Sequence, residues 1–331
     1  MSDLRAVALG GGHGLHASLS ALRLLTPELT AIVTVADDGG SSGRIRRELK
    51  VLPPGDLRMA LAALAGTGPE QQQWADLLQH RIGGHGVLAG HPVGNLILTA
   101  LLERTSDPEA ALAQLGVLVG AVGRVLPMSP VPLDLLAEAD RFDPDEPGKT
   151  RLIRGQSSIA ATPGRVKAVR LLPPGAPACA SAVDAVREAD LIVLGPGSWF
   201  TSVIPHLLLR ELGTALCATS ARVVVVLNLV PQVGETDDYA PHQLLDLLRE
   251  HAAPYGGLKV DVVVADSGSL LDPEQLDRHV SEIGARLVVS RLAADDSAER
   301  HDAARLSAAI RDAMDVPDRS GGSGGGAQRW R

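Results

Sequence analysis

The sequence predicts an α/β protein with a Rossmann-like, mostly parallel sheet, helices on both faces and a small antiparallel insertion. Apolar runs of strand length alternate with segments of helical periodicity along most of the chain. Several of these runs end directly in glycine-rich or acidic loops, which is where open α/β sheets bind their ligands. We expect a single domain over residues 1–316, with a β-rich insertion at about 124–173 and a disordered Gly/Ser-rich tail at 317–331.

The first strand and turn are typical of a nucleotide-binding fold. Residues 5–9 (RAVAL) form an apolar strand, and the segment 12–17 (GHGLHA) fits G-x-G-x-x-A before a leucine repeat of helical spacing. Asp37 follows about 25 residues after the first glycine, as in the dinucleotide fingerprint. Glycines leave the N–H groups of the helix N-terminus open to a phosphate.

The segment 37–43 (DDGGSSG) is the most informative one. It follows a strand predicted over 30–36 and places two carboxylates beside a backbone almost free of side chains. Asp37 and Asp38 could hold a Mg²⁺ ion that bridges phosphates, or one of them could accept a ribose hydroxyl. The alternative is that they only cap the loop.

The remaining elements follow in order. Helices are predicted at 43–50, after 53–56, at 69–79, 96–103 and 108–119, and strands joined by Pro/Gly turns at 124–173. Alternation resumes at Ala180 and continues to a last predicted helix at 297–314. Two further strands end in polar or glycine residues: one is followed by Gly195 to Ser198, and the next ends at Asn228. We therefore expect the loops 10–14, 37–43, 195–202 and 228–237 on one edge of the sheet.

Composition narrows the function classes. The chain has 331 residues, 45% of them hydrophobic but only 2% aromatic, and a formal charge of −8. Without a basic cluster or stacking aromatics, nucleic-acid binding is disfavoured. The spacing of Cys179 and Cys217 is not that of metal ligands, and two cysteines form no disulfide framework. The sequence shows neither a signal peptide nor an apolar run of membrane-spanning length. We therefore expect a cytoplasmic protein without membrane insertion.

Eight segments in one order resemble the bacterial gluconeogenesis-factor (YvcK-like) proteins, within the superfamily of the 2-phospho-L-lactate transferases (CofD-like). The segments are GGGHGL (10–15), VTVADDGGSSGRIR (33–46), LPPGDLR (52–58), GHPVGNLIL (90–98), VLPMS (125–129), RGQSSIA (154–160), ADLIVLGPGSWFTSVIP (189–205) and NLVPQVGETDDY (228–239). The resemblance implies a Rossmann-like fold, binding of a nucleotide such as a UDP-sugar, and a role tying carbon metabolism to cell-wall growth and cell shape. This chain departs from the family pattern at two positions. His13 stands where the family usually has a small hydroxyl residue, and Met59 stands where it usually has Asn.

The motifs and the resemblance together define the predicted ligand-binding set. It comprises Gly11, Gly12, His13, Gly14, Asp37, Asp38, Gly39, Ser41, Ser42, His91, Asn95, Gly195, Gly197, Ser198 and Asn228, with Asp37 and Asp38 as the candidate Mg²⁺ ligands. Asp56, Arg44 and Arg58 remain open between a ligand contact and a cap or surface position. The other histidines show no metal spacing, and Ser198 lacks the setting of a hydrolase nucleophile.

Three functions remain open on the sequence. The first is a regulatory protein that binds a nucleotide or UDP-sugar without turnover, with a regulatory protein partner and homo-oligomeric assembly expected. The second is a Mg²⁺-dependent transferase acting on a nucleoside diphosphate-linked donor. The third, an NAD-dependent oxidoreductase, is suggested by G-x-G-x-x-A but has no clear catalytic set beside it.

Overall fold

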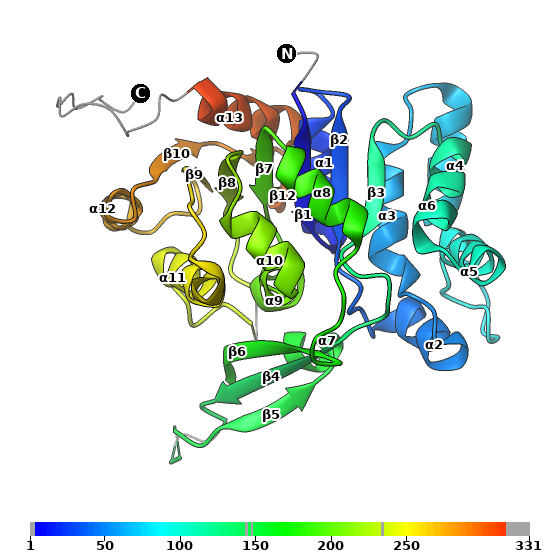
Figure 1. Ribbon diagram of the computed structural model, residues 1–331, viewed down its shortest axis with the longest axis horizontal. Helices are drawn as coiled ribbons and strands as arrows, with labels where there is room; N and C mark the ends of the chain where they lie inside the picture. The colour runs from blue at the N-terminus through cyan, green and yellow to red at the C-terminus, as the bar shows by residue number, and fades with distance from the viewer. Residues whose placement is uncertain (1–3, 143–144, 147, 233–234, 316–331) are drawn as a thin grey trace.

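A seven-stranded sheet forms the centre of the molecule in the computed structural model, which describes residues 4–142, 145–146, 148–232 and 235–315 (Figure 1). Its strands are β1 (Ala6–Gly10), β2 (Leu29–Val33), β3 (Arg124–Pro127), β7 (Leu191–Leu194), β8 (Arg222–Val226), β9 (Val262–Asp266) and β10 (Arg286–Ser290). They lie in the order β10-β9-β8-β7-β1-β2-β3, and every neighbouring pair is parallel. The predicted Rossmann-like α/β class is confirmed.

The strands form because their residues suit burial on both faces. β1 pairs with β2 from Ala6 opposite Leu29 to Gly10 opposite Val33, and with β7 from Ala6 opposite Leu191. All residues of these three strands are buried. Continuous runs of Val, Ile, Leu and Ala, without alternation with polar residues, are what parallel strands covered on both faces require.

The direction of winding reverses between β1 and β7. From β1 the chain moves outward through β2 to β3, then returns to β7 and moves the other way to β10. Connections between parallel strands are right-handed, so this reversal places helices on both faces and leaves a crevice at the carboxyl ends of β1 and β7.

Helices cover both faces of the sheet. They are α1 (Gly12–Leu22), α2 (Gly40–Leu49), α3 (Pro54–Leu64), α4 (Pro69–Gln79), α5 (Val93–Thr105), α6 (Pro108–Leu118), α8 (Ala180–Glu188), α9 (Pro205–Leu208), α10 (Arg210–Cys217), α11 (Pro241–Ala252), α12 (Pro273–Glu282) and α13 (Ala303–Asp315). α1 packs against α3 and α13, whereas α8 packs against α10 in front of the sheet (Figure 1). None of the described helices is long and apolar enough to cross a membrane.

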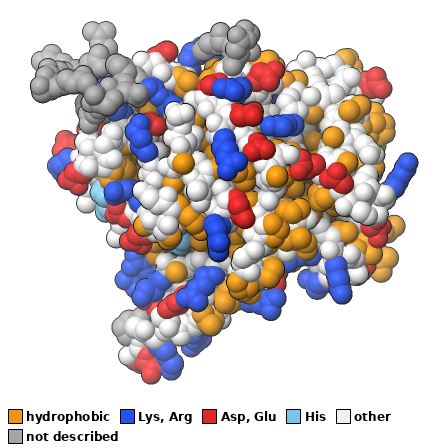
Figure 2. Space-filling view, viewed as in Figure 1, with side chains coloured by type: hydrophobic (Ala, Val, Ile, Leu, Met, Phe, Trp, Pro, Cys, Tyr) orange, Lys and Arg blue, Asp and Glu red, His pale blue; other side chains and the backbone are white. Residues whose placement is uncertain are grey.

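A three-stranded antiparallel sheet lies below the carboxyl ends of the parallel strands (Figure 1). It is built from β4 (Asp134–Asp140), β5 (Arg151–Arg154) and β6 (Arg165–Leu172), with the short helix α7 (Gln156–Ala160). We call these elements the lobe. Lys and Arg side chains gather over it (Figure 2).

Several predicted elements differ from the observed ones. Residues 124–127, predicted to belong to the insertion, form β3 and pair with β2 in the main sheet. Residues 156–160 are helical rather than extended, because Gly155, at φ +96°, turns the chain at the end of β5. Residues 297–301, predicted as helix, form β12 (Ser297–His301), which pairs with β11 (Ala293–Ala294). The predicted tail at 317–331 lies outside the described residues.

Candidate functional site

Two glycine turns meet at the crevice between β1 and β7. Ser18 of α1 donates a hydrogen bond of 2.6 Å to the carbonyl oxygen of Gly195, which follows β7. A Cβ atom on Gly14 would overlap the carbonyl oxygen of Pro196, so only glycine allows this approach. The turn at 10–14 and the turn at 195–197 therefore form one surface at the carboxyl edge.

Acidic and hydroxyl side chains lie against the first glycine turn. A Cβ atom on Gly11 would come within 2.5 Å of a carboxylate oxygen of Asp56 and of Thr34 Oγ1. The N–H of Gly12 donates to the Asp56 carboxylate, and Thr34 donates to it at 3.4 Å. The sequence leaves Asp56 open between a cap and a ligand contact. In the structure it lies in the first turn of α3, with its carboxylate at the N-terminus of α1, beside the predicted phosphate position.

Burial and neighbouring charge shift these carboxylates toward their protonated forms. Burial, together with the charge of Asp37, raises the pKa of Asp56 to about 7. Burial also raises the pKa of Asp37, against hydrogen bonds from the backbone N–H of Gly39 and from Ser42 that favour its charged form. The site therefore holds a carboxyl group that changes charge near neutral pH.

Asp38 points toward the lobe instead. Its Oδ1 accepts a hydrogen bond of 2.8 Å from the backbone N–H of Ser157 in α7. Asp37 and Asp38 are thus partnered by different segments of the chain, although the charge of Asp38 still contributes to the raised pKa of Asp37. Among the described residues no group of three or more His, Cys, Asp or Glu side chains could hold a metal. A Mg²⁺ ion that used one or two carboxylates plus ligand phosphates stays a prediction.

The serines of 37–43 belong to a helix, not to an open loop. Gly40, Ser41 and Ser42 form the first turn of α2, so the loop itself is shorter than predicted. Ser42 Oγ accepts a hydrogen bond of 3.0 Å from the backbone N–H of Gly55. Ser42 thereby ties the start of α2 to the start of α3, next to Asp37.

A buried polar chain links α2, α3 and α5. Ser41 Oγ lies 2.7 Å from Nδ1 of His91. It also accepts a hydrogen bond of 2.9 Å from the side-chain amide of Asn95. Asn95 Oδ1 in turn accepts a hydrogen bond of 2.9 Å from Arg58 Nε. Burial lowers the pKa of Arg58 to about 10 and also lowers the pKa of His91, with help from Arg44. The predicted residues Ser41, His91 and Asn95 are thus brought together with Arg58.

The second turn is held by Asn228 and by Glu235, a residue absent from the predicted set. Asn228 accepts a 2.7 Å hydrogen bond from the N–H of Gly197 and returns one of 3.0 Å to its carbonyl oxygen. Glu235 is buried and accepts hydrogen bonds from Ser198 Oγ and, at 2.9 Å, from the N–H of Phe200. Burial raises the pKa of Glu235. Its position in GETDD, directly after the Asn228 loop, was the available signal.

Three further residues discussed for the site, His13, Arg44 and Met59, lie on the helices around it. His13 is exposed on the first turn of α1. Arg44 donates to the carbonyl oxygens of Val87 and Ala89, at 3.4 and 3.0 Å, and so supports the glycine-rich segment before His91. Met59, the other departure from the family pattern, lies on α3 one residue after Arg58, and its backbone contacts His16.

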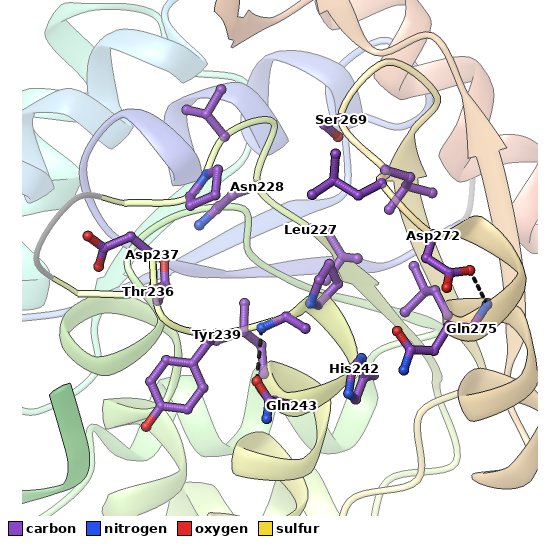
Figure 3. Close-up of a pocket in the computed structure, with 18 of the residues that line it drawn as sticks. Leu227, Asn228, Thr236, Asp237, Tyr239, His242, Gln243, Ser269, Asp272 and Gln275 are labelled. Carbon is purple, nitrogen blue, oxygen red and sulfur yellow. Dashed lines mark hydrogen bonds between the residues drawn. The ribbon is translucent and has the colours of Figure 1, made fainter.

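A pocket of about 530 Å³ opens beyond Asn228, at the carboxyl ends of β8 and β9 (Figure 3). Its walls come from 227–231, from 236–244, which includes the start of α11, and from 269–272 and 275–276 around the start of α12. Asn228 lines it and also holds Gly197. The pocket therefore adjoins the second glycine turn.

Comparison with known proteins identifies the family. The family model for the 2-phospho-L-lactate transferase CofD matches residues 6–306. The chain belongs to this family. It is 53% identical over 307 residues to the putative gluconeogenesis factor of Mycobacterium tuberculosis, covering 92% of this chain and 88% of that one. It is 38% identical over 279 residues to the gluconeogenesis factor of Bacillus subtilis, covering 84% and 83%.

A solved structure agrees with this assignment. The crystal structure of a UPF0052-family protein from Bacillus halodurans superimposes with a TM-score of 0.82 at 32% identity, covering 94% of this chain and 99% of that chain. The resemblance to gluconeogenesis factors within the CofD-like superfamily is therefore confirmed.

The CofD-like fold also bears on the oxidoreductase alternative. Tyr255 and Lys259 have the Tyr-x-x-x-Lys spacing of some NAD-dependent enzymes. Both precede β9, which begins at Val262, so they lie at the amino end of the sheet, away from the glycine turns. Lys259 is paired with Asp261 at 2.6 Å. This pair cannot reach a ligand bound at the carboxyl edge.

Proposed function

We propose that this gluconeogenesis-factor homologue is a cytoplasmic regulatory protein that binds a nucleotide-sugar, such as a UDP-sugar, at the crevice between β1 and β7. The observation that carries the proposal is the approach of Gly14 to Pro196, which joins two phosphate-compatible turns at the point where the winding reverses. The names of the relatives support a role in gluconeogenic growth. We extend this to coordination of carbon metabolism with cell-wall synthesis and cell shape.

The acidic groups beside the turn set a condition on an anionic ligand. A diphosphate at the N-terminus of α1 would lie next to Asp56 and Asp37, and like charges repel. The repulsion is relieved if Asp56 takes up a proton or if Mg²⁺ binds between carboxylate and phosphate oxygens. Asp37 and Asp56 have the oxygen donors that Mg²⁺ prefers, and the ion would supply charge neutralisation there.

Calorimetry tests the proposal directly. UDP-N-acetylglucosamine, UDP, GDP and NAD are titrated into the protein with and without Mg²⁺, from pH 6 to pH 8. We expect uridine ligands to bind more tightly than NAD. Without Mg²⁺ their affinity should fall as Asp56 loses its proton, whereas Mg²⁺ should flatten this pH dependence. NAD binding more tightly than every uridine ligand would overturn the proposal.

A second candidate is a Mg²⁺-dependent transferase of the 2-phospho-L-lactate transferase type. It is favoured by Asp56, because a carboxyl group with a pKa of about 7 suits general acid–base catalysis at neutral pH. Incubation with Mg²⁺ and labelled UDP-sugar, with and without candidate acceptors, separates the two functions. Release of UDP that is lost in Asp56→Asn would support the transferase.

The proposed biological role and assembly need separate tests. A strain lacking the gene should lose normal shape on gluconeogenic carbon sources, and wild-type protein should restore it better than Asp37→Asn. Light scattering on the purified chain tests the proposed homo-oligomer, and co-purification from cells tests for a regulatory protein partner.

A further inference from the structure

The lobe has one face buried against the main domain and one face that is partly exposed. Along β4, buried and partly exposed residues alternate, because successive side chains of a strand point to opposite faces. The buried side lies toward the main domain, where β6 contacts α9. The partly exposed residues of β4 are Asp134, Leu136, Glu138 and Asp140. We call the surface that they form with their neighbours on β5 and β6 the outer face of the lobe.

Two arginines flank a leucine in one cross-strand row of the outer face. Leu136 on β4 lies opposite Arg154 on β5 and opposite Arg170 on β6. Neighbouring strands are about 4.8 Å apart, so the two arginines begin about 10 Å from each other, on either side of the leucine. In the next row Leu152, opposite Glu138, is 67% exposed. The outer face therefore combines an apolar strip with two cationic side chains.

The cationic side chains of this face are more exposed than the carboxylates with which they pair. Arg154 exposes 67% of its side chain, whereas its partner Asp134 exposes 24%. Arg170 exposes 70%, whereas its partner Glu138 exposes 37%. Lys167 repeats the pattern above a carboxylate of β4 that is 13% exposed. Positive charge thus faces solvent on the lobe, where Lys and Arg side chains gather (Figure 2), although the whole chain has a formal charge of −8.

These arginines keep hydrogen-bond donors for an external acceptor. A guanidinium has five N–H donors. Arg154 uses its Nε and Nη2 groups on Asp134, at 3.1 and 2.5 Å. Arg170 lies 3.9 Å from Glu138, which is beyond hydrogen-bond distance. Exposed ion pairs of this kind contribute little to stability, so an incoming carboxylate can share or replace them at small cost.

The chemistry of the outer face favours one class of partner. Strands β4, β5 and β6 contain no aromatic residue on which a nucleic-acid base could stack. Each arginine has a carboxylate beside it, so a continuous array of phosphates, as on a nucleic acid or a lipid surface, would also meet negative charge. An acidic protein segment can instead place single carboxylates on the two arginines and an apolar side chain on the leucines between them.

We propose that the outer face of the lobe is a docking surface for an acidic segment of a partner protein. Carboxylates of this segment pair with Arg154 and Arg170, and an apolar side chain between them covers Leu136 and Leu152. The inference rests on the proposed function only for the existence of a protein partner, whose chemistry it supplies. Its tests need no nucleotide, so its failure leaves nucleotide-sugar binding intact.

Selection from a displayed library of random peptides tests the chemistry of the segment. The peptides are selected on the immobilised full chain in the absence of nucleotide. We expect the recovered sequences to be enriched in Asp and Glu around an apolar residue, and their binding to weaken as the salt concentration rises. Recovery of basic or uncharged sequences, or of no sequence, overturns the proposal.

Matched charge variants locate the surface. Arg170→Glu should weaken the binding of a recovered acidic peptide at least about tenfold. Arg187→Glu is the control, because Arg187 on α8 is similarly exposed, at 64%, and also pairs with a carboxylate, that of Asp184 at 3.3 Å. It should leave the affinity unchanged. If Arg170→Glu melts at a lower temperature than wild type, Leu152→Glu decides, because its exposed side chain supports no core packing. Equal affinity of wild type, the control and the folded outer-face variants overturns the docking surface.

Two further measurements separate an acidic protein segment from other occupants. Light scattering compares the oligomeric state of wild type and Arg170→Glu, and vesicles of phosphatidylglycerol or single-stranded RNA replace the peptide in the binding assay. We expect the same oligomeric state for both proteins and weaker binding of vesicles and RNA than of the peptide. Dissociation of an oligomer in Arg170→Glu would assign the face to a second copy of the chain. Tighter binding of vesicles or RNA would assign it to a polyanion, and either result overturns the proposal.

Discussion

At the scale of single residues, three carboxylates at the carboxyl edge have three different surroundings. Asp38 accepts the N–H of Ser157, Asp37 accepts from Gly39 and Ser42, and Asp56 accepts from Gly12. The sequence indicated acidic residues here but could not assign their partners, because Asp56 comes from a different helix and Ser157 from the lobe. Chemical distinctions between identical residue types thus arise from tertiary contacts.

Asp56→Asn should stabilise the protein in a pH-dependent way. The pKa of Asp56 is about 7 when folded, against an ordinary value of 3.8. Between these values the folded state holds a proton that the unfolded state has released, so stability falls as pH rises, and the penalty is complete above pH 7. The asparagine removes this penalty and keeps an acceptor for Gly12. We expect a gain on the order of 4 kcal/mol at pH 8 that disappears near pH 4.

Thermal melts of both proteins from pH 4 to pH 8 provide the measurement. A stability difference that stays constant over this range, or one that grows toward acid pH, would show that Asp56 does not titrate as described.

Asp38 offers a test of ligand role against structural role. Asn at this position can still accept the N–H of Ser157, whereas Ala cannot. Asp38→Ala should therefore lose about 0.5–2 kcal/mol, as for other lost caps, and Asp38→Asn should leave the ligand-free protein as stable as wild type. If Asp38 also serves the ligand, Asp38→Asn will reduce the melting shift produced by UDP-N-acetylglucosamine with Mg²⁺. A lowered ligand-free melting point with an undiminished shift would return Asp38 to a purely structural role.

At the scale of elements, the sequence predicted those whose pattern is local. The helix at 69–79 has the predicted bounds, because Pro69 begins it and its polar face is continuous. The assignment of β3 to the insertion was wrong because its four residues (RVLP) suit an edge strand of the main sheet and a strand of the insertion equally well. Only the pairing with β2 decides which sheet the strand belongs to. The strand at 297–301 was missed because SAERH has helix-favouring residues, and its pairing with β11 overrides that propensity.

The same limit applies to the candidate site. Glycine-rich turns and strand ends are visible in the sequence, so the meeting of 10–14 with 195–197 could be expected. Glu235 and the link from Arg58 to Asn95 depend on contacts between distant segments. No periodicity or spacing in the chain records such contacts.

Replacing Gly14 by Ala should damage the junction between the two turns. The new methyl group would overlap the Pro196 backbone, which cannot move away as a flexible side chain could. We expect a loss of about 1–3 kcal/mol and weaker nucleotide binding. Gly116→Ala is the control, because its methyl group would lie in ordinary contact, 3.7 Å from Leu61, in the interior of α6. Denaturant unfolding should show that variant unchanged or slightly more stable. Equal effects of the two substitutions would contradict a close approach at Gly14.

At the scale of the whole molecule, the sheet order brings segments distant in sequence to one edge. Segments at 10–14 and 37–43 belong to the first half of the sheet, and those at 195–202 and 228–231 to the second. A nucleotide-sugar that spans the crevice must therefore contact both halves.

Hydrogen exchange tests this arrangement. UDP-N-acetylglucosamine with Mg²⁺ should slow amide exchange in 10–16, 37–43 and 195–202 together, with weaker effects at 255–260, on the amino side of the sheet. Protection confined to one half of the sheet would argue against a ligand lying across the crevice.

The lobe touches both ends of this crevice. Asp38, beside the first half, binds the backbone of Ser157, and Tyr239, in the wall of the pocket, donates a 2.6 Å hydrogen bond to the carbonyl oxygen of Val166. The lobe is thus hydrogen-bonded on both sides of the crevice, through Asp38 beside the first half of the main sheet and through Tyr239 beside the second half. Binding at two coupled sites is reciprocal. A macromolecule that prefers the lobe in its ligand-bound arrangement raises the affinity for the ligand, and the ligand raises the affinity for that macromolecule by the same factor. The concentration of the ligand would then control how much of a partner is bound to the lobe, although the ligand itself does not contact that surface.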